Sequence, residues 1–216
     1  EKNGVEEMED NLELLKEIAD ADYLITHFAP VSSRIMEAGK KLKFIGVARS
    51  GCENIYLKAA SEKGIKVAVA AGRLADPVAD YTVGILLAEC RNISRLSLRP
   101  SDGKWTGKKP DNFKYVKCLR NKQVGIIGLG IIGKNVAERL KGFGVRLMAY
   151  DPFCPDSDFE KYECKRVDLP ELMKTADFIC IHARLTSETK GMVTKELINQ
   201  MKPSAFIVNT ARAELL

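Results

Sequence analysis

Three glycines lie at the spacing that lets a backbone turn wrap a phosphate group. Gly128, Gly130 and Gly133 fit the pattern G-x-G-x-x-G. In such a turn the first glycine makes the tight bend, the second lets the backbone approach a pyrophosphate, and the third lets a helix pack close to a strand. The free N–H groups at the start of that helix then face the phosphates. These residues predict a dinucleotide site, and the alternative is a glycine-rich turn that binds no ligand.

An acidic residue stands at the distance that the same pattern requires. Asp151 follows an apolar run and lies 18 residues beyond Gly133. At this place a carboxylate accepts both hydroxyls of an adenosine ribose and repels a 2′-phosphate. The next residues, Pro152 and Phe153, carry no positive charge. The sequence therefore predicts that the cofactor is NAD rather than NADP.

Alternating strands and helices must position these residues. The apolar run 124–127 predicts a strand before the glycines, 131–141 an amphipathic helix after them, and 145–150 a strand before Asp151. The same alternation runs through most of the chain and predicts a parallel α/β fold. We expect further strands at 23–26, 42–47, 67–70, 178–181 and 205–209, and further helices from Met8 to Ala19 and at 31–38, 55–62, 77–94, 170–175 and 194–201.

A polar, basic stretch divides this alternation into two units. It follows Arg99 and Pro100, and we expect residues 1–97 to form an incomplete substrate or catalytic domain and 98–216 an NAD-binding domain shortened at its C-terminus. Either a solvated linker or a positive rim that attracts anionic ligands explains its charge. Its cations are Lys104, Lys108, Lys109, Lys114, Lys117, Arg120 and Lys122.

Composition excludes several classes of protein. The chain has 216 residues, of which 45% are hydrophobic and 29% charged, and these values are typical of a globular protein rather than a disordered one. Its apolar runs are too short to span a membrane, and no nucleic-acid recognition motif accompanies its net charge of +5. Six cysteines without a zinc-ligand spacing and two distant histidines predict no metal site. Reduced core cysteines point to a cytoplasmic protein.

Several linked motifs resemble one family in order along the chain. They are VGIIGLGIIG at 124–133, YDPF at 150–153, ADFICIHARL at 176–185, TKG at 189–191, FIVNTAR at 206–212, LKFIGVARSGCENI at 42–55 and VADYT at 78–82. With these segments the chain resembles the D-isomer-specific 2-hydroxyacid dehydrogenase family, which includes phosphoglycerate dehydrogenase. The resemblance implies a Rossmann-type NAD-binding domain, a smaller flavodoxin-like α/β substrate domain, and a small anionic 2-hydroxy or 2-oxo acid bound between them.

The resemblance also implies roles for individual residues. Backbone groups of Ile131 and Ile132 would meet the pyrophosphate. His182, Ala183, Thr210, Ala211 and Arg212 would line the nicotinamide side. Arg212 matches the catalytic arginine of the family, and its planar guanidinium suits a grip on a carboxylate and polarisation of the adjacent carbonyl.

The substrate side departs from the family pattern. Where a glycine-rich turn usually offers backbone N–H groups to the carboxylate, this chain has Arg49, Ser50 and Gly51, which are the expected substrate-binding residues. Arg49 either adds a charge for a larger or more anionic substrate or turns away to the surface. Ala213, Leu74 and Arg184 also replace common family residues. These changes bear on which 2-hydroxy acid is the substrate more than on the class of reaction.

The family also uses a glutamate and a histidine beyond the arginine as an acid/base pair. The sequence shown ends four residues after Arg212, and neither His27 nor His182 fits that role by motif position. We therefore expect an oxidoreductase seen here without part of its active site, forming a homodimer at full length. The alternatives are an NAD-binding, non-catalytic regulatory protein of the corepressor type, and a formate dehydrogenase-like enzyme. The helix at 77–94 provides either a dimer face or hinge and core.

Overall fold

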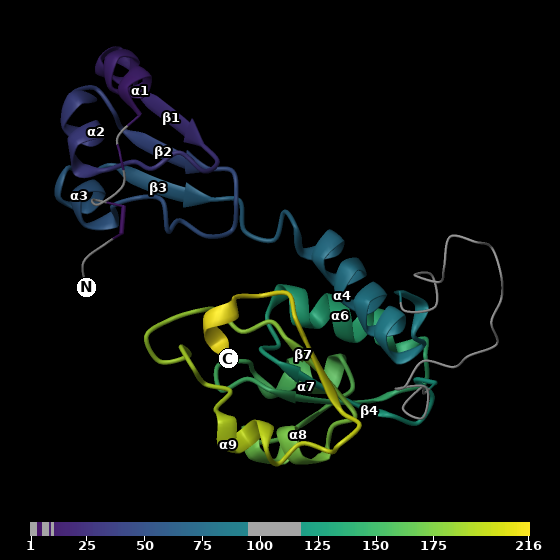
Figure 1. Ribbon diagram of the computed structural model, residues 1–216. Helices are drawn as coiled ribbons and strands as arrows, with labels where there is room; N and C mark the ends of the chain where they lie inside the picture. Colours follow the sequence, from purple (N-terminus) through teal and green to yellow (C-terminus); the bar gives the residue numbers. More distant parts are fainter. Residues whose placement is uncertain (1–3, 6–8, 10, 95–117) are drawn as a thin grey trace, which may run out of the picture. The chain divides into compact units, whose positions relative to one another are not determined.

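The computed structural model describes residues 4, 5, 9, 11–94 and 118–216. It divides into two compact units, Glu1–Leu74 and Ala75–Leu216 (Figure 1). Each unit is built on its own parallel sheet, with three strands in the first and five in the second. This arrangement confirms the predicted α/β fold class.

The first unit is a three-stranded sheet in the order β1-β2-β3. Its strands are β1 (Tyr23–Thr26), β2 (Phe44–Val47) and β3 (Lys66–Val69), and its helices are α1 (Leu12–Glu17), η1 (Ile18–Asp20), α2 (Ser33–Ala38) and α3 (Leu57–Glu62). Ile45 and Val47 of β2 pack with Ile35 of α2 and Ala59 of α3 in one buried cluster. The apolar strand residues therefore hold the helices against this sheet.

Local signals set the helix ends in the first unit. The Ser32 hydroxyl accepts a hydrogen bond from the N–H of Ile35 at 3.3 Å and caps α2. Gly64 follows α3 with φ of +67° and ends it, as the sequence predicts. Helix α2 thus begins, and helix α3 ends, at residues whose types favour helix ends.

The second unit carries the five-stranded sheet in the order β6-β5-β4-β7-β8. The strands are β4 (Gln123–Ile127), β5 (Arg146–Tyr150), β6 (Cys164–Arg166), β7 (Phe178–Ile181) and β8 (Phe206–Asn209). Every residue of β7 is buried, as expected for a central parallel strand covered on both faces. Numbered along the unit, this order is 3-2-1-4-5, so the topology reverses direction between β4 and β7.

Helices cover this second sheet. They are α4 (Ala75–Cys90), α6 (Ile131–Lys141), α7 (Asp156–Lys161), α8 (Leu169–Thr175), α9 (Lys195–Ile198) and η3 (Ala213–Leu215). Helix α4 lies along α6 (Figure 1), and Arg139 of α6 binds Asp76 of α4 at 2.9 Å and Asp80 at 2.5 Å. Beneath these ion pairs, Ala79 and Leu86 of α4 are fully buried. Helix α4 therefore contributes to the core of the second unit.

The structure differs from the sequence prediction in some of its helices and strands. Helix α7 and strand β6 were not predicted, because α7 buries a single side chain and β6 is a three-residue edge strand with two exposed cations. Helix α4 ends at Cys90 rather than residue 94, since Asn92 takes a φ of +55°. The first compact unit ends at Leu74 and the second begins at Ala75, so α4 belongs to the second unit.

Other predictions fall where the structure gives no description. The expected domain boundary between residues 97 and 98 lies outside the described residues and stays a prediction. The basic stretch also lies outside them, apart from Arg120 and Lys122.

Four of the six cysteines are buried as expected, whereas Cys52 is half-buried and Cys118 is exposed.

Candidate cofactor and substrate site

The candidate cofactor residues gather at the carboxyl ends of the parallel strands in the second unit. Gly128 follows β4, Asp151 follows β5, His182 follows β7 and Thr210 follows β8. The N–H of His182 donates to the carbonyl of Ile127 at 2.7 Å, which ties the two strands at the switch point together. Ligands of open α/β sheets bind at this edge, in the crevice where the strand order reverses.

The first glycine of the turn is required by the fold. Gly128 takes a φ of +92°, a value that residues with a Cβ atom rarely adopt. A Cβ atom on Gly128 would lie 2.6 Å from the backbone nitrogen of Ala183 and 2.8 Å from the carbonyl carbon of His182. The chain after β4 therefore passes directly against the chain after β7, and only glycine allows this approach.

The other two glycines differ in their surroundings. A Cβ on Gly133 would collide with the carbonyl oxygen of Gly128 and lie 3.2 Å from a methyl group of Ile126, so Gly133 lets α6 sit close to β4. A Cβ on Gly130 would meet no atom within 4 Å. Gly130 is also the N-cap of α6, and as a glycine it has no side chain to cap that helix end. Open space at an uncapped helix N-terminus fits the approach of a pyrophosphate.

The residue after Gly130 also faces outward. Ile131 opens α6 and is 55% exposed, whereas Ile132 is half-buried against the core. An exposed aliphatic side chain beside an open helix end is consistent with a ligand covering it. The fold therefore accommodates the dinucleotide that the sequence predicts at this turn.

Asp151 already makes hydrogen bonds that the sequence did not show. Its Oδ2 accepts from the N–H of Leu129 at 2.8 Å, and its Oδ1 accepts from Phe153 at 2.9 Å and Cys154 at 3.0 Å. A carboxylate has about four acceptor positions. Asp151 therefore shapes both the glycine turn and its own turn, and one position on Oδ2 remains for a ribose hydroxyl.

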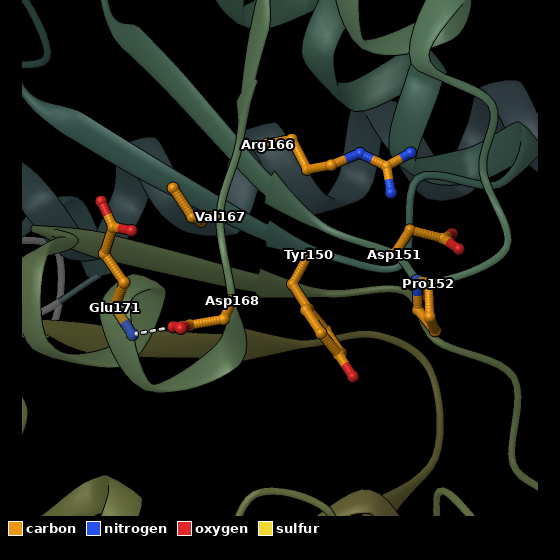
Figure 2. Close-up of a pocket in the computed structure, with 7 residues that line it drawn as sticks. All are labelled: Tyr150, Asp151, Pro152, Arg166, Val167, Asp168 and Glu171. Atoms are coloured by element: carbon orange, nitrogen blue, oxygen red, sulfur yellow. Dashed lines mark hydrogen bonds between the residues drawn. The ribbon is translucent and has the colours of Figure 1, made fainter.

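A pocket of about 400 Å³ opens beside Asp151 (Figure 2). Its lining comes from the ends of β5 and β6 and the start of α8: Tyr150, Asp151, Pro152, Arg166, Val167, Asp168 and Glu171. Sequence reasoning missed Arg166, which lies 15 residues beyond Asp151 on the neighbouring strand. Its position at the end of a parallel strand was the available signal, but β6 itself was not predicted.

A chain of hydrogen bonds reaches His182. Thr82 Oγ1 donates to the carbonyl of Val78 at 2.8 Å, so it accepts from Thr210 Oγ1 at 2.9 Å. Thr210 Oγ1 lies 3.5 Å from Nδ1 of His182. Nε2 of His182 is buried without a partner among the described residues. Burial lowers the pKa of His182 to about 4.

This pKa predicts a loss of stability in acid. The unfolded chain binds the proton of His182 near pH 6.5 and the folded chain near pH 4, so stability falls as the pH drops between these values. Between pH 7.5 and pH 4.5, protonation of His182 in the unfolded chain should lower the free energy of unfolding by about 2.5 kcal/mol. Urea unfolding of wild type and His182→Gln at both pH values measures it.

The control for this prediction is His27→Gln. His27 is exposed and stacks on Phe28, with ring centroids 4.0 Å apart. His27→Gln should keep the pH dependence of the wild type, whereas His182→Gln should lose the part that His182 contributes. An equal pH dependence in His182→Gln and wild type would show that His182 is not the responsible group.

The loop after β8 presents Arg212. The Asn209 side chain donates to the carbonyl of Arg212 at 2.9 Å and accepts from the N–H of Ala211 at 3.0 Å. The Arg212 guanidinium donates to the carbonyl of Ala211 at 3.0 Å, and the residue is exposed. Asn209 thus fixes the backbone from which Arg212 extends, a role that sequence reasoning did not assign.

The expected substrate residues lie in the first unit, after β2. Arg49 pairs with Glu53 at 2.7 Å, and its guanidinium carbon lies 5.3 Å from the centre of the Phe28 ring. The Ser50 hydroxyl donates to the carbonyl of Ala70 at 3.5 Å, and the Glu53 carboxylate lies against Gly51. Arg49 is therefore a partly exposed cation held by an acid and an aromatic ring.

Metal sites and membrane spans are both absent from the residues that the structure describes. Within them, no three His, Cys, Asp or Glu side chains come close enough together to hold a metal ion. None of the helices found there is long and apolar enough to cross a membrane.

Comparison with known proteins places the geometry in context. Residues 83–216 match the family model described as "D-isomer specific 2-hydroxyacid dehydrogenase, NAD binding domain". The sequence is 41% identical over 201 residues to a hydroxypyruvate reductase of Thermotoga maritima, covering 93% of this chain and 63% of that protein. It is 41% identical over 206 residues to a D-3-phosphoglycerate dehydrogenase of Methanocaldococcus jannaschii, covering 94% of this chain and 38% of that protein.

A solved structure shows the same fold. The NAD-dependent formate dehydrogenase of Staphylococcus aureus in complex with NAD aligns with a TM-score of 0.80 and 33% identity. The alignment covers 95% of this chain and 62% of that one. The chain therefore spans less than two thirds of the length of each of these three proteins.

Proposed function

Because the chain belongs to the D-isomer specific 2-hydroxyacid dehydrogenase family, we propose that the complete protein transfers a hydride between NAD(H) and a small D-2-hydroxy acid or its 2-oxo acid. The observation that carries this proposal is the glycine turn at the switch point, where Gly130 leaves open space at the N-terminus of α6. The names hydroxypyruvate reductase and D-3-phosphoglycerate dehydrogenase among the relatives support a phosphoglycerate dehydrogenase-like enzyme with a small anionic substrate.

In this proposal the second unit holds the cofactor. Backbone groups at Gly130, Ile131 and Ile132 bind the pyrophosphate, because the helix end is uncapped and its dipole favours negative charge. Asp151 accepts one ribose hydroxyl through its remaining position on Oδ2. Gly133 keeps α6 against β4 so that these groups stay in place. When bound, NAD(H) accepts or donates the hydride.

The nicotinamide side is formed by the loops after β7 and β8. Ala183 lies against Gly128, and Thr210 is held between His182 and Thr82, so this wall is rigid. Ala211 precedes the arginine and is half-buried. Rigid walls orient a cofactor ring and exclude water from it.

Arg212 is the proposed catalytic residue of this chain. Its guanidinium binds the carboxylate of the acid and polarises the adjacent carbonyl, and a planar fork suits both contacts. Arg49, Ser50 and Gly51 are the proposed substrate-binding residues of the first unit. An alkoxide must also be protonated, and His182 is a poor proton donor because a pKa of about 4 keeps it neutral. The proposal assigns proton transfer to the family's histidine and glutamate beyond Arg212.

Cofactor titration tests the binding half of the proposal. We expect the 216-residue chain to bind NADH at least about tenfold more tightly than NADPH, because the Asp151 carboxylate repels a 2′-phosphate. Fluorescence titration with both dinucleotides measures the ratio. Asp151→Ala should weaken NADH binding and reduce the difference between the NADH and NADPH affinities. Equal affinities of the wild type for NADH and NADPH would exclude the ribose role of Asp151.

Turnover tests the catalytic half. A polypeptide extended to the length of the relatives should oxidise NADH with at least one acid from a panel of hydroxypyruvate, glyoxylate, pyruvate and phosphohydroxypyruvate. Sedimentation of the same polypeptide tests the proposed homodimer. NADH binding without turnover on any 2-oxo acid would favour the non-catalytic regulatory alternative, and turnover confined to formate with NAD would favour the formate dehydrogenase-like one.

A further inference from the structure

The pocket beside Asp151 carries a cation that the cofactor assignment does not use. Of its seven lining residues, three are acids and one, Arg166, is basic. In Figure 2 the Arg166 guanidinium and the Asp151 carboxylate extend to the same side of the pocket, while Asp168 and Glu171 lie at its other end. A positive and a negative group therefore flank the place proposed for the adenosine ribose.

Arg166 is held in this position by three contacts. Its Nε lies 3.0 Å from Asp156 Oδ1, its terminal nitrogen donates to the carbonyl of Cys154, and its guanidinium carbon lies 4.1 Å from the centre of the Phe159 ring. The N–H of Cys154 donates to Asp151 at 3.0 Å. The two charged groups are thus bound to opposite ends of one residue, and neither moves far from the other.

We propose that Arg166 is a second determinant of cofactor specificity: its guanidinium can bind a 2′-phosphate, and the adjacent Asp151 carboxylate opposes that binding. This inference rests on the proposed NAD site. The Asp156 side chain is 83% exposed, so a phosphate can displace it from Arg166 at little cost. A guanidinium fork then binds two phosphate oxygens. Preference for NAD follows from the balance of the two charges rather than from Asp151 alone.

Binding of NADH and NADPH to variants of the 216-residue chain tests this inference by calorimetry. The quantity compared is the ratio of the dissociation constants of NADPH and NADH, since the two differ only in the 2′-phosphate. Asp151→Asn removes the charge and keeps an oxygen that accepts from Phe153 and Cys154, although its amide nitrogen cannot accept from the N–H of Leu129 as Oδ2 does. It should lower the ratio at least about tenfold, and adding Arg166→Met should restore the ratio.

The matched control is Lys165→Met. Lys165 precedes Arg166 on β6 and pairs with Glu171 at 2.8 Å, so its loss changes the net charge equally without removing the proposed phosphate partner. In the Asp151→Asn background, Lys165→Met should leave the ratio within about twofold. An equal ratio in Asp151→Asn with and without Arg166 would overturn the inference, as would an equal effect of both cation substitutions.

Two further outcomes separate this inference from the proposed function. If wild type binds neither dinucleotide, the cofactor site itself is wrong. If Asp151→Asn loses its circular dichroism spectrum, the test moves to single variants of the wild type. Arg166→Met should then raise the ratio several-fold while Lys165→Met does not, and an unchanged ratio in Arg166→Met would reject the role of Arg166.

Discussion

Substitution of Gly128 by alanine should lower the free energy of unfolding by about 3 kcal/mol or more. Two costs combine at this position. The φ of +92° strains any side chain, and the added methyl group would meet the backbone of Ala183 at 2.6 Å. A backbone neighbour cannot rotate aside as a flexible side chain does. Urea unfolding followed by circular dichroism measures the loss.

The matched control for this variant is Gly191→Ala in the same unit. Gly191 has a φ of +64°, but a Cβ there would meet no atom within 4 Å. Gly191→Ala therefore introduces the backbone strain without a steric clash, and it should lower the free energy of unfolding by about 1 kcal/mol. If both variants lost the same stability, the close approach of the chains after β4 and β7 would not be a rigid feature of the fold.

Substitution of Gly130 by alanine should instead weaken NADH binding about 100-fold while the fold stays intact. The added methyl group meets no protein atom, so folding should change by less than about 1 kcal/mol, the usual cost at an N-cap. The same methyl group occupies the open space at the start of α6, where the pyrophosphate is proposed to approach the backbone. Fluorescence titration with NADH and urea unfolding separate the two effects.

Gly84→Ala provides the control for the binding effect. Gly84 lies inside α4, and a Cβ there also meets no atom within 4 Å. This variant should bind NADH as the wild type does and should gain slight stability from the better helix propensity of alanine. Unchanged NADH affinity in Gly130→Ala would contradict the placement of the pyrophosphate at this turn.

Short-range features of the fold were predictable from the sequence. Ser32 and Thr194 cap the helices that they precede, Pro170 lies in the first turn of α8, and Gly64 ends α3. Each depends on residues three or four positions apart, so residue type alone specifies it. The spacing of the glycine turn belongs to the same class, because the pattern lies within one strand, one bend and one helix, although the close neighbour of Gly128 is the distant Ala183.

Longer-range features were not predictable in this way. Segment 154–166 lacks apolar periodicity, so α7 and β6 gave no signal, and Arg166 was missed with them. Helix α4 reads as a helix from the sequence, but its ion pairs with Arg139, 59 and 63 residues away, decide that it packs with the second unit. Such pairings depend on the order of the strands and on helix packing.

The sequence by itself determined the α/β class, the dinucleotide turn and the acid that follows it, because each depends on periodicity or spacing within one βαβ unit. The tertiary structure alone decided what these residues touch. Asp151 bonds to Leu129, 22 residues away, and Thr82 bonds to Thr210, 128 residues away. These contacts leave one acceptor position on Asp151 and hold Thr210 beside His182, since each polar group bonds only to the neighbours that the folded chain supplies.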